Sequence, residues 1–134
     1  MESPKHLSHK PIISVNNYDE IDASSANDTD AKALSIGRAQ YDNNELSLKV
    51  WRHTEEKWSR QSEELPIHRN LDLSILFLAA ISTEISAHFP KSNLREVIDN
   101  YSEVQFIKDY YEANRIYIEP RLIELKRILN NMNI

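Results

Sequence analysis

The chain has 134 residues, of which 40% are hydrophobic and 28% charged, and its formal net charge is -5. This composition predicts one globular domain that builds its core without a disulfide or a metal. The single glycine, Gly37, excludes phosphate-binding loops that need several glycines, and the absence of cysteine excludes thiol catalysis, thiolate zinc sites and disulfides.

The acidic balance also disfavours general attraction to nucleic acid or to an anionic membrane surface. Met1 is followed by polar residues rather than by the apolar region of a secretory signal. The most apolar segment, residues 73–81, is far shorter than the roughly 20 residues that a membrane span requires. We therefore expect a cytoplasmic protein with no membrane partner.

Residues 11–65 are expected to form a sheet that follows a loose N-terminal segment, residues 1–10. Residues 11–15 are a short strand candidate, and residues 16–32 are rich in Asn and Asp, which favour a long loop. Apolar residues then alternate with polar ones around Leu46, Leu48 and Val50, which is strand spacing. Turns at residues 43–44 and 54–57 complete a three-stranded antiparallel meander within residues 33–65.

Residues 66–134 are expected to be helical. Apolar residues at positions 67, 71, 75, 78, 81 and 85 predict a central helix that ends before Pro90. Capping-box spacing at residues 93–96 and 102–105 predicts two further helix starts, and Pro120 predicts a kink or a new helix. The whole chain is thus predicted to be a single α+β domain, with an N-terminal antiparallel meander of three to four strands packed against a C-terminal layer of three to four helices.

A two-residue turn at residues 43–44 would also fix which side chains share a sheet face. One face would carry small and aliphatic residues, including Gly37, as a bed that a helix can approach closely. The other face would gather Leu34, Ile36, Arg38, Lys49, Trp51, His53, Trp58 and Arg60. On that face His53 is expected opposite Trp58, and Arg60 opposite Trp51.

The basic aromatic surface made by Trp51, Trp58 and Arg60 is the main functional signal in the sequence. Cross-strand pairs of Trp with Arg or His often only stabilise a sheet, so burial under a helix or a second subunit is the leading interpretation. The alternative is a nucleic-acid or nucleotide ligand stacked on the tryptophans.

A second group of candidates joins Arg52 and His53 to the polar segment before the central helix. This segment contains Gln61, Glu63, Glu64, His68 and Arg69. In an enzyme of unknown class, a glutamate of this segment would act as a base while His68 and Arg69 polarise a substrate. In the structural interpretation, the glutamates favourably precede a helix N-terminus and Arg69 pairs with a carboxylate. No histidine spacing predicts a metal site, and no cofactor is expected.

The helices after residue 102 are predicted to carry two apolar stripes. These are Val104, Ile107, Tyr111 and Ile118 on one side and Phe106, Tyr110, Ala113 and Tyr117 on the other. One stripe can pack on the domain while the other meets a partner. We therefore expect a non-enzymatic binding module that self-associates as a homodimer, either through the basic aromatic surface or through this Tyr-rich helix.

The central part of the sequence resembles a family of small bacterial proteins known only as a domain of unknown function. The resemblance is carried by Lys49–His53 (KVWRH), by Lys57–Pro66 (KWSRQSEELP) and by His68 and Arg69 with residues 71–73. It extends back through residues 17–19, 21–22, 30–32 and 34–35, and it covers roughly residues 9–80. It implies a bacterial cytosolic origin but no activity, cofactor or catalytic residue.

Overall fold

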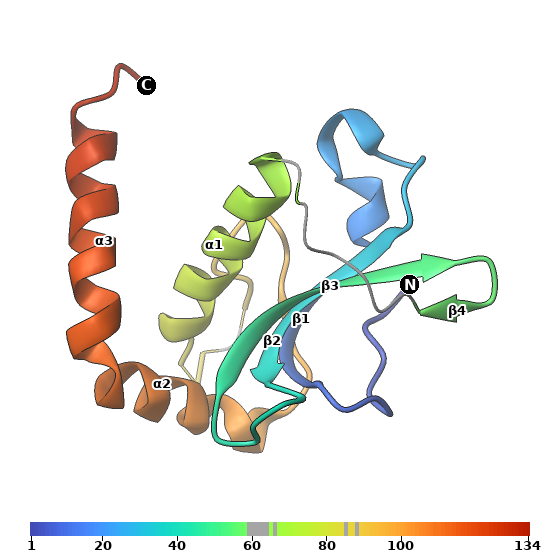
Figure 1. The fold of residues 1–134 in the computed structure, drawn as a ribbon, viewed down its shortest axis with the longest axis horizontal. Coiled ribbons are helices and arrows are strands. Elements are labelled where there is room, and N and C mark those ends of the chain that lie inside the picture. The colour runs from blue at the N-terminus through green and yellow to red at the C-terminus, as the bar shows by residue number, and fades with distance from the viewer. Residues whose placement is uncertain (59–64, 66, 85, 88) are drawn as a thin grey trace.

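A computed structural model of the chain describes residues 1–58, 65, 67–84, 86–87 and 89–134 (Figure 1). The strands are β1 (Lys10–Asn16), β2 (Ala31–Arg38), β3 (Leu46–Thr54), β4 (Lys57–Trp58) and β5 (Val97–Ile98). The helices are α1 (Ile67–Ile81), α2 (Val104–Ala113) and α3 (Arg115–Asn130), with short 3-10 turns at Tyr18–Glu20, Ala23–Ser25 and Tyr101–Glu103. The predicted α+β class is confirmed.

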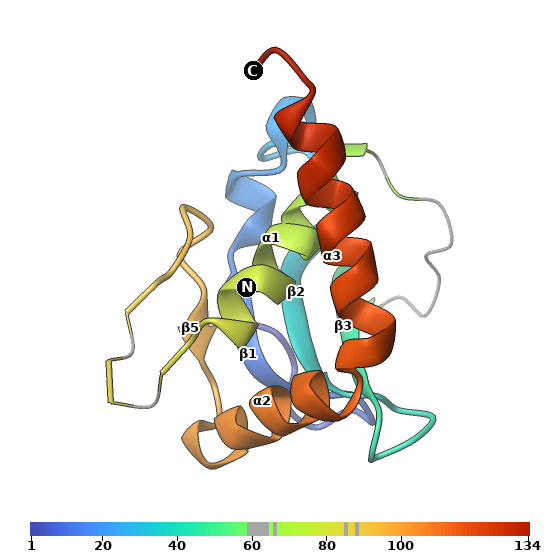
Figure 2. The same ribbon diagram turned by 90° about the vertical axis from the view of Figure 1, so that its left-hand side faces the viewer.

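The strands form one antiparallel sheet in the order β4-β3-β2-β1-β5. The helices lie on one side of this sheet, with α1 against it, α2 crossing below and α3 standing outside (Figure 2). The core lies between the sheet and α1, where Leu34, Ile36 and Val50 share a buried cluster with Leu73 and Leu76. No helix among the described residues is both long enough and apolar enough to cross a bilayer.

The register of the β2–β3 hairpin differs from the prediction. A two-residue turn would place Tyr41 opposite Leu46, but the connection spans residues 39–45 and places Arg38 opposite Leu46. The shift is three residues, an odd number, so every β2 side chain moves to the other face relative to β3. The predicted faces are therefore wrong: Leu34 and Ile36 pack under α1, whereas Trp51 lies opposite Ala33 on the other side of the sheet.

Gly37 is needed for close approach of a strand, not of a helix. A Cβ built on Gly37 would lie 2.0 Å from the carbonyl oxygen of Lys10, where an irregularity in the β1–β2 register brings the two backbones together. Such a distance is far inside van der Waals contact. The predicted close approach of a helix is therefore wrong, because the close neighbour of Gly37 is the backbone of β1.

The predicted central helix exists, but a different side of it is buried. The buried residues of α1 are Arg69, Leu73, Leu76, Ala79 and Ala80. The residues whose spacing predicted the helix are largely exposed, with Ile67 at 78% and Leu71 at 55%. Since α1 is apolar on more than one side, periodicity alone did not identify the side that meets the sheet.

Two predicted helix boundaries are also wrong. Residues 93–96 do not begin a helix, because the Glu96 carboxylate accepts hydrogen bonds from the backbone N–H groups of Lys91 and Ser92 and closes a turn before β5. Pro120 lies inside the continuous helix α3. The chain breaks at Asn114 instead, between α2 and α3, while the expected start near residue 102 is realised at Val104.

Candidate functional site

The sheet face that carries Trp51 is covered by the chain's own N-terminal segment. Trp51 is 1% exposed, and its Nε1 donates a hydrogen bond to Ser35 Oγ at 2.7 Å. The His9 ring packs edge-on against Trp51, with ring centroids 5.6 Å apart, and is hydrogen-bonded to Ser35 and Ser47. The first ten residues, expected to be loose, thus place a histidine in a buried position. The Trp51 ring is therefore covered and offers no face to a base or sugar.

His9 is held in its neutral form by this environment. Burial, assisted by the nearby charge of Lys49, lowers the pKa of His9 from 6.5 to about 4. The unfolded chain binds a proton at His9 near pH 6.5, and the folded chain does not until the pH approaches 4, so acidification favours unfolding within this window.

We therefore expect the free energy of unfolding to fall by about 2 kcal/mol between neutral pH and about pH 5 through His9. Urea titrations at several pH values measure this change. In the His9→Gln variant the dependence should be flatter, because glutamine retains hydrogen-bonding capacity but does not titrate. His6 is exposed, so His6→Gln should follow the wild-type curve. Equal slopes for His9→Gln and wild type would contradict the assignment.

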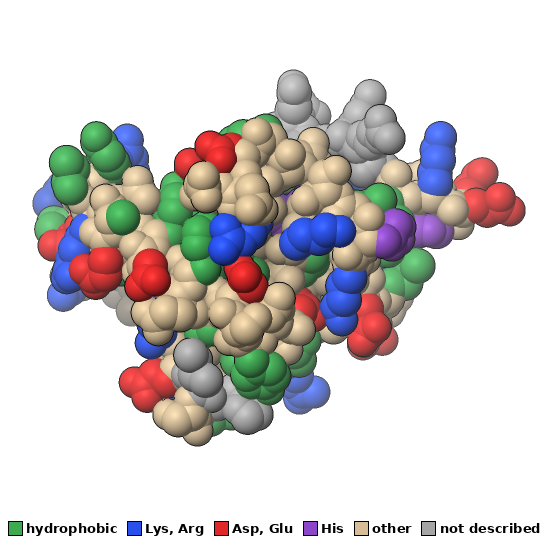
Figure 3. Space-filling model, turned by 90° about the horizontal axis from the view of Figure 1, so that it is seen from below, with side chains coloured by type: hydrophobic (Ala, Val, Ile, Leu, Met, Phe, Trp, Pro, Cys, Tyr) green, Lys and Arg blue, Asp and Glu red, His purple; other side chains and the backbone are tan. Residues whose placement is uncertain are grey.

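The described candidates of the basic aromatic surface other than Trp51 lie around the Trp51 ring. Trp58 contacts both Trp51 and His53, with ring centroids 5.9 Å and 5.0 Å apart, and His53 lies opposite Trp58 as predicted. Lys49 Nζ lies 4.4 Å from the Trp51 ring centroid. Seen from below, Lys and Arg side chains are scattered among acidic and uncharged ones on the face drawn in Figure 3. Arg60, Gln61, Glu63 and Glu64 lie outside the described residues.

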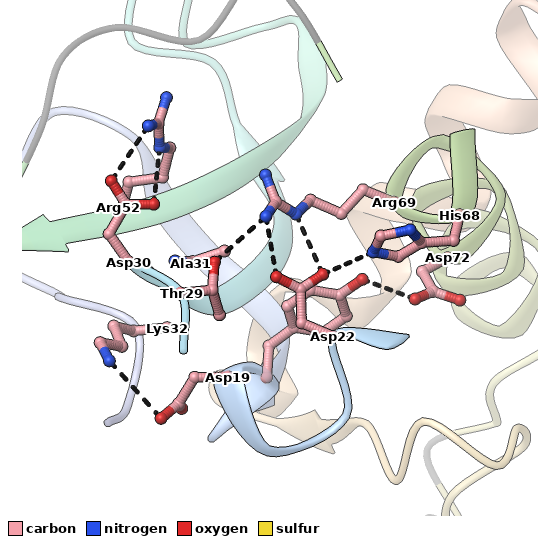
Figure 4. Close-up of polar contacts among 11 residues, drawn as sticks. Asp19, Asp22, Thr29, Asp30, Ala31, Lys32, Arg52, His68, Arg69 and Asp72 are labelled. Atoms are coloured by element: carbon pink, nitrogen blue, oxygen red, sulfur yellow. Dashed lines mark hydrogen bonds and ion pairs between the residues drawn. The ribbon is translucent and has the colours of Figure 1, made fainter. Parts of the chain in front are cut away.

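A buried ionic cluster holds the start of α1 against the β1–β2 loop (Figure 4). The ionic cluster consists of Asp22, Thr29, His68 and Arg69. Asp22 is fully buried and accepts two hydrogen bonds from Arg69, Nε to Oδ1 at 3.1 Å and Nη2 to Oδ2 at 2.8 Å. His68 Nε2 lies 2.6 Å from Asp22 Oδ1, and Arg69 also donates to Thr29 Oγ1 at 3.1 Å. Burial alone would raise the pKa of Asp22, but the hydrogen bonds from Arg69, His68 and Thr29 outweigh it and lower that pKa.

A second hydrogen bond ties the next turn of α1 to the same loop. The Tyr18 hydroxyl donates to Asp72 Oδ2 at 2.6 Å. Burial, together with this hydrogen bond, raises the pKa of Tyr18. Beside the cluster, Arg52 forms a bidentate pair with Asp30, with both distances 3.0 Å. Arg52 therefore approaches a carboxylate of the loop, whereas His53 belongs to the aromatic group around Trp58.

The sequence identified two of the residues in this cluster and missed the others. His68 and Arg69 were candidates, and the pairing of Arg69 with a carboxylate was the structural interpretation of that segment. Asp22 was hidden within an Asn/Asp-rich stretch expected to be loop. A usable signal was present, since residues 18, 22, 30, 52, 68, 69 and 72 all belong to the segments that carry the family resemblance.

The contacts of the ionic cluster support a structural role, in which the cluster holds the β1–β2 loop against the start of α1. Asp22 is fully buried, and its carboxylate oxygens accept hydrogen bonds from Arg69 while one of them also contacts His68, so the carboxylate is shielded from solvent by these contacts. Among the residues that the structure describes, no group of three or more His, Cys, Asp or Glu could hold a metal ion. The cluster therefore joins loop to helix within one chain.

The outer side of the helical layer is a large unpartnered surface of the described structure. Helix α3 has no buried residue, and even its apolar Leu125 and Leu129 are 51% and 50% exposed. Seen from the sheet, α3 stands beyond α1 (Figure 1). Helix α1 itself exposes Ile67, Leu71, Ile75 and Leu78. Exposed apolar side chains therefore gather on the helices at this side of the molecule.

A cavity of about 270 Å³ lies at the base of this helical layer. Ile36, Leu46 and Leu48 of the sheet line it together with Phe77 of α1, Tyr110 of α2 and Ile118 of α3. The Tyr110 hydroxyl donates a hydrogen bond to Glu45, and burial raises the pKa of Tyr110 to about 12. The lining is mostly apolar, so the cavity suits an aliphatic or aromatic group.

Comparison with known proteins gives a family match. A protein-family model described as a family of unknown function (DUF6530) matches residues 1–93. Neither a curated protein nor a solved structure matches the chain. The ionic cluster lies wholly inside the matched part, whereas α2 and α3 lie beyond it.

Proposed function

The chain belongs to this family of unknown function, and we propose that it is a non-enzymatic interaction module that self-associates through the exposed apolar side chains of α1 and α3. The main support for the proposal is the exposure of α3. Its residues Arg115–Asn130 bury no side chain, although apolar residues recur along it. An isolated helix of this length is only marginally stable in water, so a packing partner is expected to hold it.

The exposed apolar area is sufficient for a stable interface. The large apolar side chains exposed on the two helices are Ile67, Leu71, Ile75, Leu78, Ile116, Tyr117, Ile123, Leu125, Ile128 and Leu129. Ile116 and Ile123 lie on the side of α3 opposite Leu125 and Leu129. At roughly 100 Å² each, the other side chains present on the order of 800 Å², which is about what a standard interface buries per partner. A second copy supplies the same apolar surface, so a two-fold arrangement satisfies both copies at once.

The proposed contact surface lies partly inside and partly outside the family match, since α1 falls within residues 1–93 and α3 falls beyond them. The ionic cluster and most of the sheet lie within residues 1–93 and build the domain, and α3 adds the contact surface. A cytoplasmic location is part of the same proposal, since a chain without cysteine gains nothing from an oxidising compartment.

Light scattering coupled to size-exclusion chromatography tests the proposal. We expect a mass of twice 15.7 kDa for the wild type at high micromolar concentration. The double variant Leu125→Glu/Leu129→Glu should be monomeric with a folded core, because both side chains are half exposed and lie outside the buried cluster. Its circular dichroism spectrum should lose part of the helical signal, since α3 then has no packing partner.

The matched control is Asn130→Glu, which adds a charge to the same helix without removing an apolar side chain. It should remain dimeric. A monomeric wild type would overturn self-association, and a dimer that survives both leucine substitutions would overturn the choice of surface.

A further inference from the structure

The apolar residues along one side of α3 follow the spacing of a coiled-coil seam. Ile118, Leu122, Leu125, Leu129 and Met132 are separated by alternating steps of four and three residues. With Leu122 and Leu129 at a positions, the others fall at d positions. Ile118 also lines the cavity beside Phe77, so this seam begins at the groove between α3 and α1. We call these five residues the α3 seam.

We propose, resting on the self-association above, that the α3 seam pairs antiparallel with the α3 seam of a second copy. Leu122 then lies opposite Leu125 of the second copy, and Ile118 opposite Leu129. Two-fold symmetry repeats both contacts, which gives four successive apolar layers.

The charges beside the seam decide the direction. In a parallel pair, Arg115 occupies an a position and faces Arg115 of the second copy, and Arg121 approaches Lys126 across the e and g positions. Both contacts bring like charges together. In the antiparallel pair, Arg115 lies beside Met132 instead, and Glu119 lies beside Lys126 of the second copy. Charge pairing at these flanking positions sets orientation in coiled coils.

The cavity supports the same arrangement. Ile118 lies at its edge, together with Tyr110 and the sheet residues that line it. Opposite Ile118, the antiparallel register places Leu129 of the second copy, a half-exposed side chain in the single chain. A volume of about 270 Å³ is large enough to receive a leucine side chain. The second copy's α3 thus packs along the α3 seam, and its Leu129 enters the cavity beside Ile118.

Cysteine cross-linking tests the direction, because the natural chain has no cysteine. The single variants Ile118→Cys and Leu129→Cys are oxidised separately and as an equimolar mixture. Antiparallel pairing predicts a covalent dimer of the two variants only in the mixture, since residue 118 of one copy then lies about 16 Å along the helix from residue 118 of the other. A parallel pair would instead cross-link each variant with itself.

Charge reversal tests the pairing of Glu119 with Lys126. Lys126→Glu introduces a carboxylate that lies beside Glu119 of the second copy at two symmetric positions, and we expect this repulsion to raise the dimer dissociation constant about tenfold at low salt. The double variant Glu119→Lys/Lys126→Glu should recover most of this loss. Glu124→Lys, away from the flanking positions of the seam, serves as the control and should change the constant by less than about threefold.

The outcomes separate the two proposals. A dimer that cross-links each variant with itself, or that fails to cross-link in the mixture, overturns the antiparallel seam and leaves self-association standing. A monomeric wild type overturns both. If the mixture cross-links but charge reversal has no effect, the seam and its register stand, and the pairing of Glu119 with Lys126 as the cause of the direction is overturned.

Discussion

Replacing Asp22 with alanine should lower the free energy of unfolding by about 3 to 5 kcal/mol. Asp22 is fully buried, and its carboxylate is the shared acceptor of Arg69 and His68. Without it, the nearly buried guanidinium of Arg69 keeps its charge but loses the acceptor that offsets its desolvation. Chemical denaturation at neutral pH measures the difference, with the m-value showing whether unfolding stays two-state.

Asp30→Ala is the matched control for this substitution. Asp30 also forms a bidentate pair with an arginine, Arg52, but both partners are partly exposed. Such pairs contribute about 1 kcal/mol or less. If both alanine variants lose the same stability, the special role of the buried cluster is refuted.

The pH dependence of the Asp22 effect has a definite sign. Its pKa in the folded chain is lower than its ordinary value, so the ionised cluster stabilises the fold at and above the ordinary carboxyl range. This contribution disappears as the pH falls through the folded pKa, because the carboxylate is then protonated in both states. The gap between wild type and Asp22→Ala should therefore narrow in strong acid.

Gly37→Ala should cost about 3 kcal/mol or more, although the same substitution in an open strand is harmless or favourable. The new methyl group would overlap the Lys10 carbonyl oxygen at 2.0 Å, and backbone cannot swing aside as a side chain can. Either β1 moves away from β2 or the strands lose hydrogen bonds near Pro11. Thermal denaturation followed by circular dichroism measures the cost.

Lys32→Ala is the companion variant on the same strand. Lys32 forms a partly exposed pair with Asp19, and its removal adds no atom near the backbone. It should change stability by about 1 kcal/mol or less. Wild-type stability in Gly37→Ala would show that β1 and β2 separate without penalty, contrary to the structure.

The sequence predicted the longer strands and helices because strand alternation and helical spacing are local properties, but it missed β5 in the half expected to be helical. Alternation around Leu46 to Val50 predicted β3, and the segment from Ile67 predicted α1. The register depended on the length of the 39–45 connection, which the Asn43-Asn44 pair did not reveal. A local preference for a tight turn was overridden by packing of Leu34 and Ile36 under the helix.

The candidate site was predictable only in part, for a related reason. His68 and Arg69 stood out because charged side chains preceded an apolar helix, but their partner lies more than forty residues earlier in the chain, at Asp22. Nothing in local spacing joins such residues. For α3, the sequence showed its apolar stripes but not which elements would cover them, and the described structure leaves its seam beside an open groove.

The break at Asn114 separates two parts of the chain that differ in thermodynamic role. Val104 and Ile107 of α2 are fully buried in the core, and β5 pairs with β1, so the cooperative unit extends past residue 93, where the family match ends. Beyond Asn114 no side chain of α3 is buried. Substitutions in α3 should therefore cost the core little stability, whereas substitutions at Val104 or Ile107 of α2 should weaken the whole domain.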